Sequence, residues 1–152
     1  MFAYKKKTHK FNRWSYALEL LSPYMIDNPS SAEMYSFDIA KIKSEKSLSS
    51  EEEINLFYKY FDGDEEALKQ ILKSNLKHVV SIVKQNKSPY LSESDSIIEG
   101  TWGLIKAAHR FDDRFKLKFI EFATSWIREN VNQTIDEEKA FKKIKDIVTY
   151  NE

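Results

Sequence analysis

The sequence contains no cysteine, so it can form neither a disulfide bond nor a thiolate metal site. Its three histidines, His9, His78 and His109, are scattered without the spacing of metal ligands. No nucleophile–base pair or phosphate-binding loop is recognisable either. We therefore expect no metal, no cofactor and no enzymatic activity. A chain without cysteine also suits a reducing cytoplasm.

The sequence carries no net charge, because 24 lysines and arginines balance 24 aspartates and glutamates. A neutral chain has no overall field that attracts nucleic acid, so any such binding must come from local patches. Long apolar runs are absent as well, and we expect neither a signal peptide nor a membrane span. The length of 152 residues, with 41% hydrophobic and 32% charged residues, indicates a soluble globular protein.

No segment shows the alternating pattern of a β-strand, and apolar residues recur in steps of three and four, so we expect an all-α fold. A short helix from Trp14 should end at Pro23. Two Ser-x-x-Glu capping boxes, Ser30 with Glu33 and Ser50 with Glu53, should open the next two helices, the first reaching about Lys43. A longer helix should run from Glu65 to the stop at Lys87–Pro89, with its apolar face formed by Leu68, Ile71, Leu72, Leu76, Val79, Val80 and Val83.

The chain divides into three parts on this pattern. Residues 1–29 form a basic arm and a short helix, and residues 30–138 form the main helical domain. Residues 139–152 form a short terminal helix or tail after an acidic break at Asp136–Glu138. Residues 1–13 hold five lysines and arginines and no acid. Such a run is either a solvated arm or an arm that contacts nucleic acid.

Residues 95–138 contain the most informative patterns, two helices that meet at a hinge, Asp112–Asp113. Ser92 should cap the first helix, which contains Gly100 and Gly103. Each glycine costs a helix about 1 kcal/mol relative to alanine. Close approach of another helix or of a partner's backbone would offset that cost.

Asp95 and Glu99 lie four residues apart, on one face of the first of these helices. Two interpretations remain open for this pair. It forms either a solvated acidic face or a socket for arginines on a partner protein.

The second helix, expected from about Lys116, places Phe119, Phe122 and Trp126 within roughly 60° of one another. They lie at the rim of an apolar stripe whose centre is Ala123, Ile127, Val131 and Ile135. Just ahead of them, Phe111 and Phe115 alternate with Arg110, Arg114, Lys116 and Lys118. Rings and cations together are what single-stranded nucleic acid requires. The alternative is that the rings are core, but their rim position favours a surface platform.

Several motifs, in the same order and spacing, resemble regions 1.2 and 2 of the bacterial sigma-70 family over about residues 32–138. Three of them are Asn75–Lys77 followed by Val79–Ile82, Asp95-x-x-x-Glu99-Gly100-x-x-Gly103-Leu104-x-Lys106-Ala107, and Lys118-Phe119 followed by Ala123-Thr124-x-Trp126-Ile127-Arg128. Upstream, Met34-Tyr35, Leu48–Ile54 and Gly63–Ala67 also follow the family. The resemblance implies a compact all-α domain similar to region 2.

The resemblance also implies partners and site residues. Sigma factors bind core RNA polymerase, and region 2 docks on a helical coiled coil of the largest subunit. The matching positions here are Asp95, Ile98, Glu99, Thr101 and Ile105, which favours the arginine socket. Family aromatics hold flipped bases of the non-template strand of the promoter −10 element. The expected DNA-binding residues are Arg110, Phe111, Arg114, Phe115, Lys118, Phe119, Glu121, Phe122, Ser125, Trp126, Arg128, Glu129 and Gln133.

Departures from the family predict an altered specificity. Ser125 replaces a tryptophan, Gln133 replaces an arginine, and Glu121 and Glu129 replace neutral polar residues. A carboxylate repels phosphate but accepts a hydrogen bond from cytosine's amino group. We therefore do not expect the common −10 sequence to be read.

The chain resembles a reduced sigma factor without regions 3 and 4, as in phages and two-subunit sigma factors. A second protein would then recognise the upstream promoter element, in the cytoplasm of the bacterial host. The alternative is a regulator that occupies the sigma site on polymerase without opening DNA.

Overall fold

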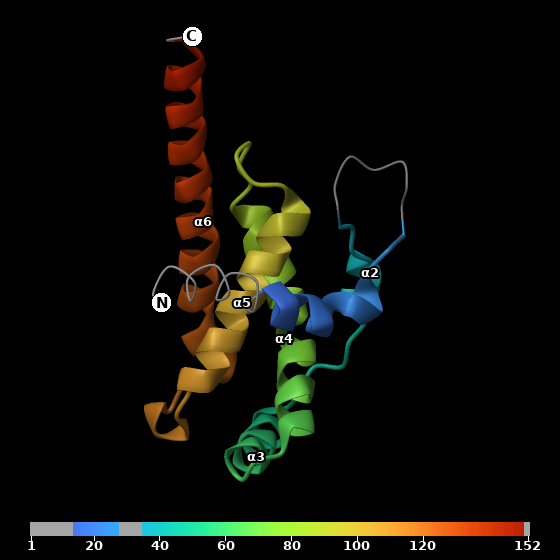
Figure 1. The fold of residues 1–152 in the computed structure, drawn as a ribbon. Coiled ribbons are helices and arrows are strands. Elements are labelled where there is room, and N and C mark those ends of the chain that lie inside the picture. The colour runs from blue at the N-terminus through green and yellow to red at the C-terminus, as the bar shows by residue number, and fades with distance from the viewer. Residues whose placement is uncertain (1–13, 28–34, 151–152) are drawn as a thin grey trace.

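The computed structural model describes residues 14–27 and 35–150, and within them the fold is all-α, as the sequence predicts. Residues 14–21 are helical and are followed by the 3-10 helix η1 (Ser22–Tyr24). The remaining elements are α2 (Ile39–Lys43), α3 (Ser50–Phe61), α4 (Glu65–Gln85), α5 (Glu93–Arg110), the 3-10 helix η2 (Asp113–Phe115) and α6 (Phe119–Tyr150) (Figure 1). No helix in the described part is long and apolar enough to cross a membrane.

Helix α5 packs between α4 and α6 and forms the centre of the core (Figure 1). All seven apolar residues predicted for the inner face of α4 are buried. Helix α3 packs across one end of α4, and the N-terminal helical segment, residues 14–21, adds Ala17, Leu20 and Leu21 to the same core. The core therefore joins segments from both ends of the described chain.

The two glycines of α5 lie where neighbouring helices come closest. A Cβ atom on Gly103 would stand 2.7 Å from the carbonyl oxygen of Trp126 and 2.9 Å from the Cα of Ile127. A Cβ atom on Gly100 would stand 2.8 Å from Cγ1 of Val79. The prediction that another helix approaches these glycines is confirmed, and the contact with α6 is too close for any side chain at position 103.

The capping of α3 differs by one residue from the prediction. Ser49 and Glu52 form the capping box, and Ser50 is the first helical residue. Both Ser-x-x-Glu pairs match the motif, but the Glu53 carboxylate has another partner, the backbone N–H of Phe119 at 3.1 Å. The prediction for Ser92 is confirmed, since its hydroxyl accepts the N–H of Asp95.

The helix expected to reach Lys43 is shorter than predicted. It begins at Ile39 with Asp38 as its N-cap, and residues 35–38 are not helical. Phe37 forms an isolated bridge with Met25 instead, and the N–H of Asp38 donates to the carbonyl of Tyr24 at 2.7 Å. This extended pairing satisfies backbone groups that a helix would otherwise satisfy. The Ser30–Glu33 capping box lies outside the described residues.

Helix α6 is continuous, so the predicted break at Asp136–Glu138 is wrong. It also begins at Phe119 rather than near Lys116, which adopts a left-handed backbone conformation with φ of 53°. Acidic residues are ordinary helix formers when their side chains face water, so three in a row do not end a helix. Its last turns extend beyond the body and leave Phe141, Ile144, Ile147 and Val148 exposed (Figure 1).

Candidate nucleic-acid and protein interfaces

Aromatic side chains from α3, from the connection between α5 and α6, and from the start of α6 form one continuous cluster. The ring centroid of Phe111 lies 4.7 Å from that of Phe57, 5.4 Å from that of Phe119 and 5.6 Å from that of Phe122. Edge-to-face and tilted contacts at these distances stabilise a packed aromatic group. The structure thus brings together rings that are more than 60 residues apart in the sequence.

The inner layer of this cluster is core, which corrects the prediction for two residues. Phe119 is 0% exposed and Phe111 is also buried, so neither ring lies on the surface platform expected from the sequence. The pattern of α6 places Phe119 at the rim of its apolar stripe, where the ring could be exposed. In the structure, the ring of Phe57 on α3 lies 5.2 Å from that of Phe119 and helps to bury it. The pattern of one helix cannot reveal a contact from another.

The outer layer remains at the surface, as predicted. Phe115 is 47% exposed, and Phe122 and Trp126 are half-buried. Their centroids follow one another at 5.4 Å and 6.0 Å, and the Arg110 guanidinium carbon lies 5.7 Å from the centre of the Trp126 ring. We call Phe115, Phe122 and Trp126 the outer aromatic row. Rings held on a rigid base, with a cation over one of them, can stack on planar ligands.

A groove of about 290 Å³ opens beside the cluster, between α3 and the α5–α6 connection. Its lining combines apolar, basic and acidic side chains: Ser50, Glu53, Ile54, Phe57, Phe111, Asp113, Lys116, Leu117 and Lys118. Burial raises the pKa of Glu53 above the ordinary carboxyl value, and the hydrogen bond from Phe119 opposes this shift. Glu53 was missed as a site residue because it matched a capping motif.

One of the cations near the cluster, Arg114, is exposed but is paired within the chain. Arg114 donates from Nη2 to Asp112 at 2.6 Å and from Nε at 2.9 Å. Bonding to Arg114 lowers the pKa of Asp112 to about 2. The Tyr58 hydroxyl donates to Asp113 at 2.6 Å, which raises the pKa of Tyr58. Arg114 is therefore engaged within the hinge.

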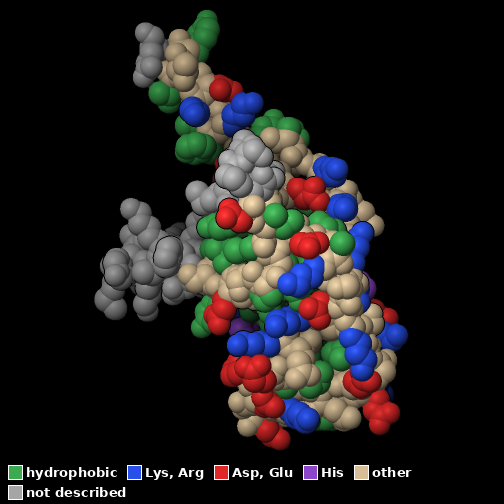
Figure 2. All heavy atoms as spheres, turned by 90° about the vertical axis from the view of Figure 1, so that its right-hand side faces the viewer, with side chains coloured by type: hydrophobic (Ala, Val, Ile, Leu, Met, Phe, Trp, Pro, Cys, Tyr) green, Lys and Arg blue, Asp and Glu red, His purple; other side chains and the backbone are tan. Residues whose placement is uncertain are grey.

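The other predicted DNA-binding side chains lie at the surface. Those that are exposed are Arg110, Lys118, Glu121, Ser125, Arg128, Glu129 and Gln133. On the face drawn in Figure 2, basic and acidic side chains are interspersed, as a neutral chain predicts. On this face, any attraction for a phosphate chain must therefore come from local groups of basic side chains.

Glu99 is fully buried, so the interpretation of Asp95 and Glu99 as a solvated acidic face is wrong for Glu99. Its carboxylate accepts the indole N–H of Trp14 at 2.8 Å and an amide N–H of Asn130 at 3.1 Å. The Asn130 amide oxygen accepts Lys106 Nζ at 2.6 Å. A buried carboxylate requires such donors, because burial without them is costly.

The remaining residues predicted to bind polymerase share this helix but differ in exposure. Ile98, Thr101 and Ile105 are buried, and Asp95 is half-buried. The Thr101 hydroxyl has no hydrogen-bond partner among the described residues. Sequence patterns could not reveal the burial of Glu99, because its partners Trp14 and Asn130 lie on other segments of the chain.

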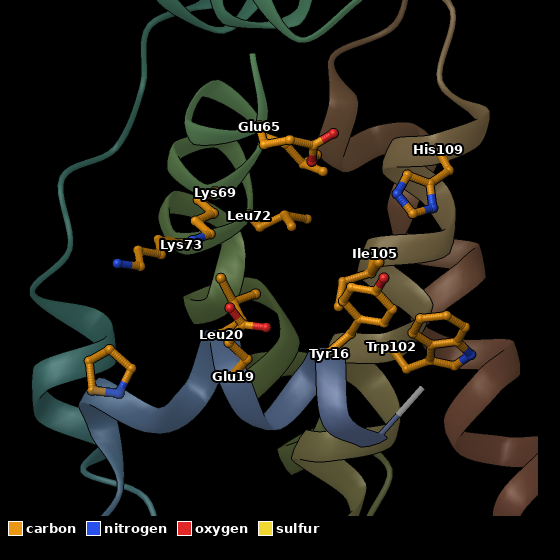
Figure 3. A pocket seen from close by; sticks show the side chains of 12 residues that line it. Tyr16, Glu19, Leu20, Glu65, Lys69, Leu72, Lys73, Trp102, Ile105 and His109 are labelled. Atoms are coloured by element: carbon orange, nitrogen blue, oxygen red, sulfur yellow. The ribbon is translucent and has the colours of Figure 1, made fainter. Parts of the chain in front are cut away.

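A second cavity, of about 490 Å³, lies between residues 14–23, α4 and α5 (Figure 3). Its apolar lining consists of Leu20, Pro23, Leu68, Leu72, Trp102 and Ile105. Charged and polar side chains complete the lining: Tyr16, Glu19, Glu65, Lys69, Lys73 and His109. No sequence motif indicated this cavity, because its walls come from three separate segments.

Comparison with known proteins gives the family. No family model matches the chain. It is 40% identical over 110 residues to RNA polymerase sigma factor SigA of Clostridium acetobutylicum, a match that covers 72% of this chain and 28% of that protein. It is also 40% identical over 88 residues to RNA polymerase sigma factor SigA of a Bacillus species, covering 58% of this chain and 23% of that protein.

The chain therefore spans about a quarter of the length of the curated relatives it matches. The resemblance stated from the motifs is confirmed by these identities and by the all-α fold. The chain is a sigma-70 family region-like protein, related to one part of an RNA polymerase sigma factor.

Proposed function

We propose that this chain is a transcription initiation factor that binds core RNA polymerase and engages the non-template strand of a promoter −10 element. The observation that carries the proposal is the outer aromatic row, Phe115, Phe122 and Trp126, held at the surface by a buried aromatic base. The names of the two relatives, both RNA polymerase sigma factors, support the same function.

The aromatic end is suited to unpaired bases. Stacking one base on an aromatic ring contributes about 1–3 kcal/mol, and unstacking a base from duplex DNA costs a few kcal/mol. The groove of about 290 Å³ beside the row has a volume near the lower limit of small-molecule pockets, about 300 Å³. It can take one planar base, with Lys116 and Lys118 at its wall for the adjoining phosphates.

The charges around the outer aromatic row favour binding of an already unpaired strand over opening of a closed duplex. Glu121 and Glu129 are exposed on the same stretch of α6, and Ser125 provides no ring. Carboxylates beside the strand repel its phosphates, while Arg110 and Arg128 attract them. We infer that the factor holds a strand that is already loose and does not itself open a closed duplex efficiently.

Polymerase docking is assigned to α5 in this proposal. Asp95 lies in the first turn of α5 and is half-buried, and Glu99, Ile98, Thr101 and Ile105 continue along the helix. Recognition of an upstream promoter element by a second protein, and action in the cytoplasm of a bacterial host, remain predictions.

The test uses core RNA polymerase of Clostridium acetobutylicum with the full chain. Two templates with the same AT-rich sequence are compared, one closed and one with a pre-opened bubble. We expect polymerase-dependent binding to the bubble, with non-template thymines protected from permanganate, and much weaker binding to the closed duplex. Absence of polymerase-dependent binding to both templates would refute the proposal.

A second candidate is a regulator that occupies the sigma site on polymerase without engaging DNA. The exposed Glu121 and Glu129 beside the aromatic row favour it. It predicts that the chain co-purifies with core polymerase but adds no affinity for the bubble template, which separates it from the first function.

A further inference from the structure

The N-terminal helical segment, residues 14–21, lies over the part of α5 that carries Glu99. Trp14 donates its indole N–H to the Glu99 carboxylate at 2.8 Å, across 85 positions of sequence. Further along the segment, Tyr16 lies beside Trp102 and Ile105 of α5, and all three line the same cavity (Figure 3). The segment therefore covers the helix to which the proposed function assigns polymerase docking.

The two ends of this region differ in the kind of contact that the described residues make. At its C-terminal end, the carbonyl of Tyr24 accepts the N–H of Asp38, the Tyr24 hydroxyl donates to Glu45, and Lys41 donates to the carbonyl of Pro23 at 2.8 Å. At the other end, Trp14 donates to Glu99, makes an edge-to-face contact with Tyr35 at 6.5 Å, and packs partly buried against the core.

The outer side of the segment is also open. Tyr16 is 62% exposed, and with Glu19, Leu20 and Pro23 it lines the cavity of about 490 Å³ between the segment, α4 and α5. Release of this segment would expose Ala17, Leu20 and Leu21, but the contacts that join α4, α5 and α6 to one another do not involve it.

We propose that residues 14–21 form a releasable cover on α5, and that core RNA polymerase binds α5 by displacing it. The inference rests on the proposed function, because it assigns a control to the same docking face. Trp14 then competes with the polymerase for Glu99, and the polymerase supplies cationic or N–H donors in place of the indole N–H.

The cover makes a quantitative prediction about affinity. If only a fraction of the chains is uncovered, the apparent affinity for polymerase is reduced by that fraction. Loss of a hydrogen bond to a charged group shifts such an equilibrium by about tenfold or more. Weakening the cover should therefore tighten polymerase binding, whereas a purely structural segment would leave binding unchanged or weaken it.

Trp14→Phe keeps an aromatic ring and removes the indole N–H that Glu99 accepts. We expect it to bind Clostridium acetobutylicum core polymerase about tenfold more tightly than the parent chain. Val83→Ala is the matched control, because Val83 is buried in α4 and should lower the melting temperature without touching the cover.

A locked form provides the opposite change and does not depend on whether Trp14→Phe folds. The chain has no cysteine, so Tyr16→Cys with Lys69→Cys creates a unique pair on opposite walls of the same cavity. A bis-maleimide linker with a central disulfide joins the two thiols and is cut by reductant. We expect the linked chain to bind polymerase at least tenfold more weakly, and reductant to restore the affinity.

Lys69→Cys carrying the same linker at one end controls for the bulk of the reagent. Hydrogen exchange supplies a separate readout: amides of residues 14–21 should lose protection when polymerase binds, and those of α5 should gain it. Equal polymerase affinity of the linked and reduced forms would overturn the cover while leaving the proposed function intact. Failure of the parent, the reduced form and Trp14→Phe to bind polymerase would overturn both.

Discussion

The aromatic end and the α5 face differ in whether their candidate site residues are exposed or buried. At the aromatic end, a buried layer of Phe57, Phe111 and Phe119 supports an outer row that remains at the surface. On α5, the acidic Glu99 is fully buried and bonded within the chain. Of the two proposed interfaces, the aromatic row is exposed in the free protein, whereas the Glu99 carboxylate on α5 is buried.

The contrast teaches that position on a helix does not decide exposure. Phe119 and Phe122 are three residues apart on α6, yet the first is core and the second is half-exposed. Asp95 and Glu99 are four apart on α5 and differ in the same way. The first predictions below test the members of these two pairs, and all are ordered from the largest expected effect to the smallest.

Phe119→Ala should be the most damaging change at the aromatic end. It removes a fully buried ring that contacts Phe57 and Phe111, and such truncations cost about 3–5 kcal/mol of unfolding free energy. Urea unfolding followed by circular dichroism measures this loss. A loss below about 1 kcal/mol would mean that the inner layer does not support the outer row.

Glu99→Lys should also destabilise the chain, by about 3–5 kcal/mol, because it places an unpaired cation where a carboxylate accepts two donors. Asp95→Lys is the comparison, since Asp95 is half-buried at the start of α5.

Asp95→Lys should keep most of its stability and lose polymerase binding, measured by co-purification beside thermal unfolding. Retained polymerase binding would exclude Asp95 from the docking face. Normal stability of Glu99→Lys would show that the Glu99 network is not part of the folded core.

Phe122→Ala should weaken binding of the polymerase complex to a bubble template by about 1–3 kcal/mol, the contribution of one stacked base. Affinity for a labelled bubble template measures the effect, at a salt concentration kept constant. Phe141→Ala is the control, because Phe141 is exposed on the far part of α6. If the two variants bind the bubble equally well, the outer row serves packing only.

Glu129→Gln should tighten bubble binding slightly, by up to about 1 kcal/mol, because an exposed charge near a phosphate chain contributes little in water. The gain should shrink as salt is raised, since salt screens the repulsion that the change removes. Titration at two salt concentrations tests this, and a gain independent of salt would point to a change in base preference.

Glu53→Gln should have the smallest effect, and one that depends on pH. The pKa of Glu53 is raised in the folded chain, so its protonated form is favoured there. The protonated Glu53 therefore contributes to the free energy of unfolding. This contribution is fully present below the unfolded pKa of 4.5 and is lost as the pH rises through the folded pKa.

The neutral glutamine can still accept the N–H of Phe119 and lacks this titration. The parent should therefore lose stability relative to Glu53→Gln from about pH 4.5 upward. Urea unfolding of both chains at a series of pH values gives the difference. Parallel stability curves would contradict the assignment.

Local sequence patterns determined most of the helices. The steps of three and four in α4, the cap at Ser92 and the hinge at Asp112–Asp113 all lie where the patterns predicted. Gly100 and Gly103 also predicted a close helix contact, because glycine inside a helix is costly unless space requires it. These features depend on residues within a few turns of one another.

Only the tertiary structure decided which functional residues are accessible. Phe57 closes the rim on which Phe119 lies, and Trp14 bonds the Glu99 carboxylate, although these partners are 62 and 85 positions away in sequence. Likewise, the Glu53 carboxylate does not cap α3 as predicted but accepts the backbone N–H of Phe119. Burial is set by whichever segment packs over a residue, and helical periodicity carries no information about a neighbour so distant in the chain.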